Sequence, residues 1–222
     1  MIAEKIQLDL NLERLLLSLE ELQRMLPIEK RGSHYGGWSV QSVQGSYKEG
    51  WSMELVPFNG PDNIGPSWHP ESVEEEKLSS IQDYKVPTEA ALGEFNQVLK
   101  KLESLGLHPR RSRIICLEPG SELKWHQDGL ASQYQVRVHI PLLTNENAFF
   151  ETQEGRFHMP ADGDGYLVHT NLFHRATNYG TTPRFHFVSF VWDRHLISRH
   201  HRYYPEQSPG ETAHHTNTWF MK

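Results

Sequence analysis

The chain has 222 residues, of which 37% are hydrophobic and 11% aromatic. This composition supports a buried core and argues against a largely disordered chain. A formal net charge of −6 gives no general attraction to nucleic acid or to an anionic membrane. No apolar run approaches the roughly 18 residues of a membrane-spanning helix, and the N-terminal stretch lacks the apolar segment of a secretory signal. A single cysteine excludes an intramolecular disulfide. We therefore expect a cytoplasmic globular protein with no nucleic-acid or membrane partner.

The N-terminal part of the chain predicts a helix, short strands and a loop. Residues 12–26 carry leucines at steps of three and four, which is the pattern of an amphipathic helix. Short alternating stretches within residues 38–56 indicate strands. Residues 57–87 are rich in Pro, Gly, Asn and acidic side chains. We expect them to form a long surface loop, of the kind that can border an active site.

A second amphipathic helix is expected over residues 89–105, with Thr88 as its N-cap and Gly106 just after its end. After residue 107 the apolar pattern changes to period two, which predicts strands separated by polar turns. The predicted strands are residues 111–117, 135–143, 147–152, 165–170 and 184–192.

This arrangement predicts a mainly β fold, a sandwich or barrel with the helices packed outside. We expect one domain over residues 1–222. Its three parts are a helix-and-strand N-terminal part (1–107), a β core that carries the functional site (108–194) and a C-terminal tail (195–222).

The segment His126-Gln127-Asp128 is the first candidate for chemistry. In an extended chain, residues two apart point to the same side, so an imidazole and a carboxylate converge. His174 lies downstream and is a candidate third ligand. Two histidines and one carboxylate on one face of a metal leave coordination positions open, an arrangement that suits non-haem Fe(II) and O2. An H-x-D segment alone also occurs by chance.

Inward-pointing cations are the second signal. Along residues 135–143 the apolar residues occupy one face, while Arg137 and His139 share the other. Arg184, which lies ten residues after His174, repeats this pattern together with His186. A buried arginine needs an anion, and its planar fork binds a carboxylate with two hydrogen bonds. From the residues alone, Arg184 can equally pair with a structural Asp or Glu, and His186 can equally line the barrel or pack.

These segments together resemble a known family. The series PGSELKWHQD, RVHIPLLTNE, FHM, His174 and TPRFHFV is similar to the aspartyl/asparaginyl β-hydroxylase family of Fe(II)/2-oxoglutarate-dependent dioxygenases, and within it to L-proline cis-4-hydroxylase-like enzymes. The resemblance covers roughly residues 108–194. It implies a double-stranded β-helix (jelly-roll, cupin-like) core with flanking N-terminal helices.

The resemblance also implies roles for individual residues. His126, Asp128 and His174 would bind Fe(II), and Arg184 would pair with the distal carboxylate of 2-oxoglutarate. His139 would lie beside the other end of this cosubstrate, and Arg137 would bind a carboxylate of the substrate. A serine that holds 2-oxoglutarate in some relatives has no counterpart here, because isoleucine stands at the matching position, 115.

Two further residues are candidates for the substrate pocket. His158 also occurs in the pattern of the proline hydroxylases, although a packing role is the commoner one for such a histidine. Trp38 precedes the long loop and could line a pocket, although buried core aromatics are more common.

The function implied is hydroxylation of an amino-acid side chain, coupled to conversion of 2-oxoglutarate and O2 into succinate and CO2. The substrate can be a free amino acid, a carrier-bound one or a residue in a peptide, with a slight preference for a small amino acid. Two alternatives stay open: a cupin-type metal enzyme that uses no 2-oxoglutarate, and a non-catalytic barrel that binds an amino acid or peptide. Neither substrate identity nor oligomeric state follows from the sequence.

Overall fold

The computed structural model describes residues 3–30, 34–49, 84–126, 136–170 and 173–192. The predicted metal ligand Asp128, most of the predicted 57–87 loop and the predicted 195–222 tail lie outside these ranges. The helices are α1 (Leu12–Met25) and α2 (Gly93–Ser104). The strands are β1 (Ala3–Ile6), β2 (Glu29–Lys30), β3 (Tyr35–Ser39), β4 (Gln41–Ser42), β5 (Val86–Pro87), β6 (His108–Leu117), β7 (Ser121–Glu122), β8 (Val136–Leu143), β9 (Ala148–Thr152), β10 (Gly155–Phe157), β11 (Gly165–Val168), β12 (His174–Asn178) and β13 (Arg184–Trp192).

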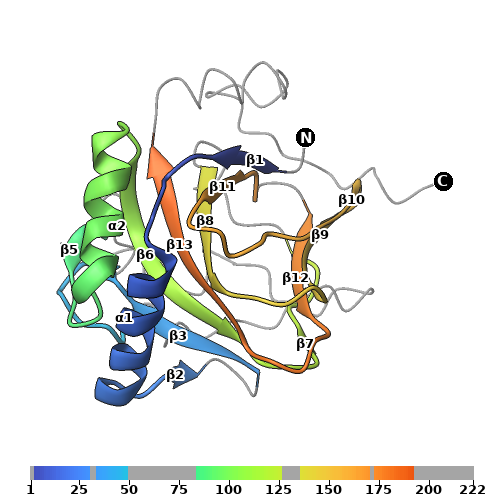
Figure 1. The fold of residues 1–222 in the computed structure, drawn as a ribbon, viewed down its shortest axis with the longest axis horizontal. Coiled ribbons are helices and arrows are strands. Elements are labelled where there is room, and N and C mark those ends of the chain that lie inside the picture. Colours follow the sequence, from blue (N-terminus) through green and yellow to red (C-terminus); the bar gives the residue numbers. More distant parts are fainter. Residues whose placement is uncertain (1–2, 31–33, 50–83, 127–135, 171–172, 193–222) are drawn as a thin grey trace, which may run out of the picture.

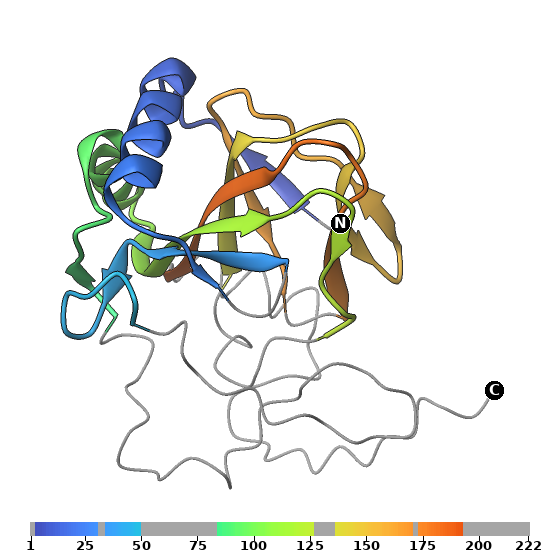
Figure 2. The same ribbon diagram turned by 90° about the horizontal axis from the view of Figure 1, so that it is seen from below.

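Two antiparallel sheets form the core. The larger has the order β1-β11-β8-β13-β6-β3-β2, and the smaller has the order β10-β9-β12-β7. Figures 1 and 2 show both helices against one face of the larger sheet and the smaller sheet on its other side. The predicted mainly β fold, a double-stranded β-helix with flanking N-terminal helices, is confirmed. Neither helix in the described ranges is long and apolar enough to cross a membrane.

Alternation along the central strands divides the larger sheet into an apolar face and a polar face. The alternate β8 residues from Val136 to Leu142 are buried in the core beneath the helices, as are Phe185 and Phe187 of β13. The residues between them face the smaller sheet. This places the predicted inward cations between the two sheets.

The helices match the predictions with one correction. α1 begins after Asn11, whose side chain accepts a hydrogen bond from the backbone N–H of Arg14. α2 begins at Gly93 and not at residue 89, so the predicted N-cap, Thr88, is wrong. The Thr88 hydroxyl bonds to the backbone of Ser39 instead. The cap of α2 comes from α1, because Ser18 Oγ accepts from the backbone N–H of Glu94.

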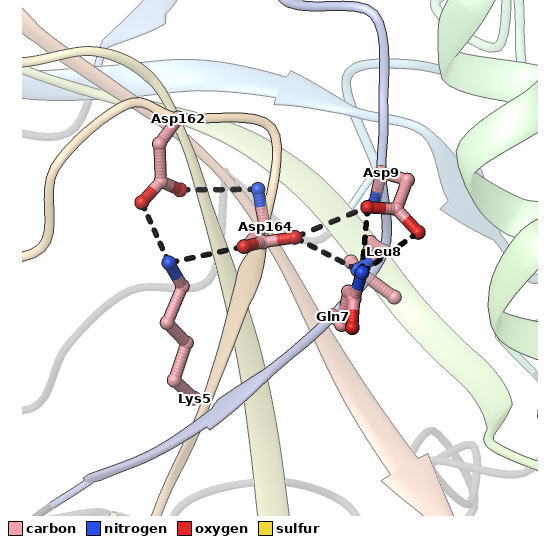
Figure 3. A network of polar contacts seen from close by, with 6 residues as sticks. All are labelled: Lys5, Gln7, Leu8, Asp9, Asp162 and Asp164. Atoms are coloured by element: carbon pink, nitrogen blue, oxygen red, sulfur yellow. Dashed lines mark hydrogen bonds and ion pairs between the residues drawn. The ribbon is translucent and has the colours of Figure 1, made fainter.

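An ion-pair network fixes β1 at the edge of the larger sheet. Lys5 Nζ lies 2.8 Å from an oxygen of Asp162 and 3.0 Å from one of Asp164. The other Asp164 oxygen accepts the backbone N–H groups of Leu8 and Asp9, at 3.0 and 3.3 Å (Figure 3). The chain turn before α1 is thereby bound to the loop before β11.

Asp164→Ala is expected to lower the free energy of unfolding by about 1–3 kcal/mol, because two backbone donors lose a charged acceptor. Lys5→Ala, the matched control, should cost less, because an exposed ion pair contributes little. Hydrogen bonds from Leu8 and Lys5 hold the pKa of Asp164 below its ordinary value. Its contribution is therefore complete at neutral pH and is lost as the pH falls through that lowered pKa. Urea unfolding at several pH values tests this, and equal stability of Asp164→Ala and wild type at neutral pH would contradict it.

Candidate active site

A cavity between the two sheets collects most of the predicted site residues. Its polar lining residues are Tyr35, His126, Arg137, His139, Thr170, His174, Arg184 and His186. Its apolar lining is Ile115, Leu123, Phe150, Ala176 and Val188. Among these lining residues, all within the described ranges, there is no Asp or Glu. The wall is therefore suited to a negatively charged ligand.

His126 and His174 form a directly opposed antiparallel pair. The backbone N–H of His126 bonds to the carbonyl of His174 at 3.0 Å, and that of His174 bonds to the carbonyl of His126 at 2.9 Å. Residues opposed in this way send their side chains to the same face. The two imidazole centroids are accordingly only 4.3 Å apart. The register of the pair thus brings together two predicted ligands that are 48 residues apart in the sequence.

The tautomer of His126 fits metal binding. Its Nδ1 lies 2.8 Å from the carbonyl oxygen of Lys124. Because a carbonyl only accepts, Nδ1 carries the proton, and in the neutral ring the lone pair is on Nε2. Such an N–H···O=C bond is the usual means of orienting a metal-binding imidazole. His174 is held by stacking on Phe150, with ring centroids 5.1 Å apart.

The described residues fit a metal in part. Two converging imidazoles are suitable donors for Fe(II). Asp128, the third predicted ligand, follows His126 by two residues and lies outside the described ranges. Within those ranges no group of three His, Cys, Asp or Glu side chains could hold a metal.

A polar cluster braces this pair from outside the cavity. Arg175 follows His174 and Trp125 precedes His126, and the Arg175 guanidinium lies 5.1 Å from the Trp125 ring centroid. Arg175 also forms ion pairs with Glu122 at 2.9 Å and Glu151 at 2.8 Å. This cluster joins β7, β9 and β12, the strands that carry or flank both histidines.

Arg184 is a buried cation without a carboxylate partner in the described part of the chain. Its exposed fraction is 4%, and burial lowers the pKa of its guanidinium to about 10. Its Nη2 lies 3.1 Å from Nδ1 of His186. A buried arginine is costly unless an anion compensates it. The position is therefore suited to a ligand carboxylate.

Arg137 and His139 lie on β8 and line the same cavity. The Arg137 guanidinium lies over the ring of Phe190, 4.3 Å from its centroid. The buried ring of His139 makes edge-type contacts with the rings of Phe150 and His186, and the centroid of each lies 5.8 Å from that of His139. Burial, followed by the charge of Arg184, lowers the pKa of His139 well below its ordinary value. His139 is therefore neutral at physiological pH.

The structure does not bring two of the predicted substrate residues into the cavity. Trp38 is fully buried on the opposite face of the larger sheet, where its indole N–H donates to the carbonyl of Leu26. It packs against Phe185 in the core, which is the alternative reading of a buried aromatic. His158 Nδ1 lies 2.9 Å from the carbonyl of Ala148, and His158 is not among the lining residues.

Sequence reasoning missed two lining aromatics. Tyr35 precedes a pair of glycines in β3, which began earlier than predicted, and its side chain lines the cavity. Phe150 of β9 supports His174 and faces His139. Alternation within the predicted strand over 147–152 could have indicated an inward Phe150, whereas Tyr35 had no such signal.

A family model matches the part of the chain that contains most of the residues lining this cavity. The model of the family described as "Aspartyl/Asparaginyl beta-hydroxylase" matches residues 67–194, more than half of the chain. No curated protein matches the sequence.

Similar solved structures share the fold. One is an oxidoreductase of the 2OG-Fe(II) oxygenase family from Burkholderia pseudomallei, with 14% identity, coverage of 86% of this chain and 84% of that chain, and a TM-score of 0.50. Another is a prolyl hydroxylase from Trichoplax adhaerens in complex with a hypoxia inducible factor peptide fragment, with 10% identity, coverage of 89% and 86%, and a TM-score of 0.50. At these identities the likeness shows the double-stranded β-helix fold.

Proposed function

The chain belongs to the aspartyl/asparaginyl β-hydroxylase family, and from this premise we propose that it is an Fe(II)- and 2-oxoglutarate-dependent hydroxylase of an amino-acid side chain. The observation that carries the proposal is the cavity itself. One wall presents the converging imidazoles of His126 and His174. Another presents the buried guanidinium of Arg184, which has no carboxylate partner among the residues that the structure describes. A metal would bind the two imidazoles, and a carboxylate of a dicarboxylate cosubstrate would pair with the guanidinium.

The residues would divide the work as follows. His126, His174 and Asp128 would hold Fe(II), and Arg184 would bind the distal carboxylate of 2-oxoglutarate with its planar fork. Bound Fe(II) would supply the chemistry that couples O2 and the decarboxylation of 2-oxoglutarate to hydroxylation of a C–H bond. His139 would lie beside the other end of the cosubstrate. Because its ring is neutral and buried, it would not compete with Arg184 for the negative charge of the cosubstrate.

Arg184 is also the reason to prefer this function over a cupin-type enzyme without 2-oxoglutarate. A metal site alone does not require a buried arginine, and an arginine without a carboxylate partner in the described chain costs stability. A dicarboxylate cosubstrate would remove that cost.

We propose a small amino acid as the substrate, with its carboxylate on Arg137. Arg137 lines the cavity on β8, two residues from His139, and is a second cation separate from Arg184. The sequence resemblance to L-proline cis-4-hydroxylase-like enzymes makes proline the first amino acid to test. A peptide substrate is the alternative, which blocked and unblocked amino acids distinguish.

The proposal is tested by aerobic incubation of the Fe(II)-loaded protein with 2-oxoglutarate and single amino acids or short peptides. Succinate and a product heavier by one oxygen atom should appear in equal amounts for one class of substrate. Product formation that proceeds without 2-oxoglutarate would support the cupin-type alternative and overturn the proposal.

A further inference from the structure

His186 is a buried histidine of the cavity wall to which none of the roles above is assigned. It lies on β13 two residues after Arg184, its exposed fraction is 1%, and it lines the cavity. Its Nε2 has no hydrogen-bond partner among the residues that the structure describes. A buried nitrogen in this state costs stability unless a ligand completes it.

The contact with Arg184 decides which nitrogen of His186 carries the proton. A guanidinium has only donors, so Arg184 Nη2 donates to His186 Nδ1 across the 3.1 Å between them. Nδ1 is therefore the acceptor, and the proton of the neutral ring lies on Nε2. Burial, followed by the charge of Arg184, lowers the pKa of His186 well below its ordinary value, which agrees with a neutral ring. The contact with Arg184 thus makes Nε2 of His186 a donor.

The two residues that pair with His186 in the sheet have no side-chain hydrogen-bond donor. Its register partners are Ile115 on β6 and Pro141 on β8, and neither side chain can donate a hydrogen bond. His139 is the adjacent ring, 5.8 Å away, and no hydrogen bond joins the two. Beside the cation of Arg184, His186 Nε2–H is therefore the donor that this row of the sheet offers to an anion.

We propose that His186 is a binding residue for the cosubstrate, and that its Nε2–H donates a hydrogen bond to a carboxylate oxygen of bound 2-oxoglutarate. This inference rests on the proposed function. Arg184 has two parts in it, since it pairs with the anion directly and also fixes the tautomer of its neighbour. A neutral donor adds binding without the repulsion that a second buried cation would meet from Arg184.

Two substitutions separate the donor from the acceptor of His186. In His186→Asn the amide oxygen can still accept from Arg184 near the Nδ1 position, but no donor reaches the Nε2 position. In His186→Gln the amide lies one methylene farther out, so its N–H can replace the Nε2–H. His108→Asn, at an exposed histidine at the start of β6, is the matched control.

Calorimetric titration of the anaerobic, Fe(II)-loaded proteins with 2-oxoglutarate provides a readout other than turnover. We expect His186→Asn to bind roughly 10- to 100-fold more weakly than wild type, because a hydrogen bond to a charged group is lost. His186→Gln should recover most of the affinity, and His108→Asn should match wild type.

The outcomes distinguish this inference from the function on which it rests. If wild type does not bind 2-oxoglutarate, the proposed function itself fails. If wild type binds and His186→Asn binds equally well, or if His186→Gln is as weak as His186→Asn, the donor role is overturned. Should the variants fail to fold, nitrogen NMR of ¹⁵N-histidine-labelled, Zn(II)-loaded wild type decides. An Nε2–H resonance that shifts with 2-oxoglutarate supports the role, and one that does not shift overturns it.

Discussion

His126→Ala will abolish Fe(II)-dependent turnover and leave the fold intact. The substitution removes one imidazole of the His126–His174 pair, a proposed Fe(II) ligand whose ring is already oriented by the Lys124 carbonyl. The backbone bonds that join the two residues do not involve the side chain, so the strand pairing should persist. We expect at least a roughly 100-fold loss of metal affinity, since outer partners of metal ligands alone change affinity by about 10- to 100-fold, and turnover below detection.

Metal binding by calorimetry and hydroxylation measured by mass spectrometry test this expectation, with circular dichroism as the check on folding. His108→Ala is the control, because His108 is an exposed histidine at the start of β6. If His126→Ala bound Fe(II) and turned over like the control, His126 would not be a metal ligand. If the non-catalytic alternative held, His126→Ala would also leave amino-acid binding unchanged.

Arg184→Ala is expected to weaken binding of 2-oxoglutarate by roughly 100-fold or more, because the proposed bidentate, charge-assisted contact with the distal carboxylate would be lost from a buried site. The variant should also lose the preference for 2-oxoglutarate over 2-oxobutyrate, which lacks the distal carboxylate. Metal affinity should change little, because Arg184 lies on β13, whereas His126 follows β7 and His174 begins β12. Calorimetric titration of both 2-oxo acids into the anaerobic holoprotein measures these effects.

Arg184→Lys provides the graded comparison. It keeps the positive charge but loses the fork, so its affinity for 2-oxoglutarate should lie between those of wild type and Arg184→Ala. Equal affinity of wild type and Arg184→Ala for 2-oxoglutarate would show that the guanidinium serves another anion and would remove the main support for this cosubstrate.

The central strands could be predicted because apolar and polar residues alternate along them, which indicates the buried face. In β8 and β13 every second residue packs beneath the helices, and this fixed the inward direction of Arg137, His139 and Arg184 from the sequence alone. Two other strands, β1 and β12, lack this alternation and were not predicted. β12 is short and polar and is held by the ion pairs of Arg175, while β1 is bound through Asp164.

The site could be predicted in kind but not in full. Local spacing indicated His126, and only the register of two distant segments places it opposite His174. Trp38 was predicted as a pocket residue but lies in the core, because the sequence pattern of an aromatic beside a loop does not distinguish the two positions. The tautomer of His186 depends on a contact across two residues of one strand, which no composition or period reveals. The late start of α2 likewise depends on a cap supplied by Ser18 of the other helix.

The central claim is that one cavity holds Fe(II) and 2-oxoglutarate together, and its most direct test is an anaerobic spectroscopic titration. The apoprotein is titrated first with Fe(II) and then with 2-oxoglutarate, while the weak visible absorption band of an iron-chelated 2-oxo acid is followed. We expect the band to appear with one equivalent of each component in wild type and to be absent in His126→Ala. At the same 2-oxoglutarate concentration it should be strongly reduced in Arg184→Ala. Tight Fe(II) binding without any such band in wild type would contradict the account.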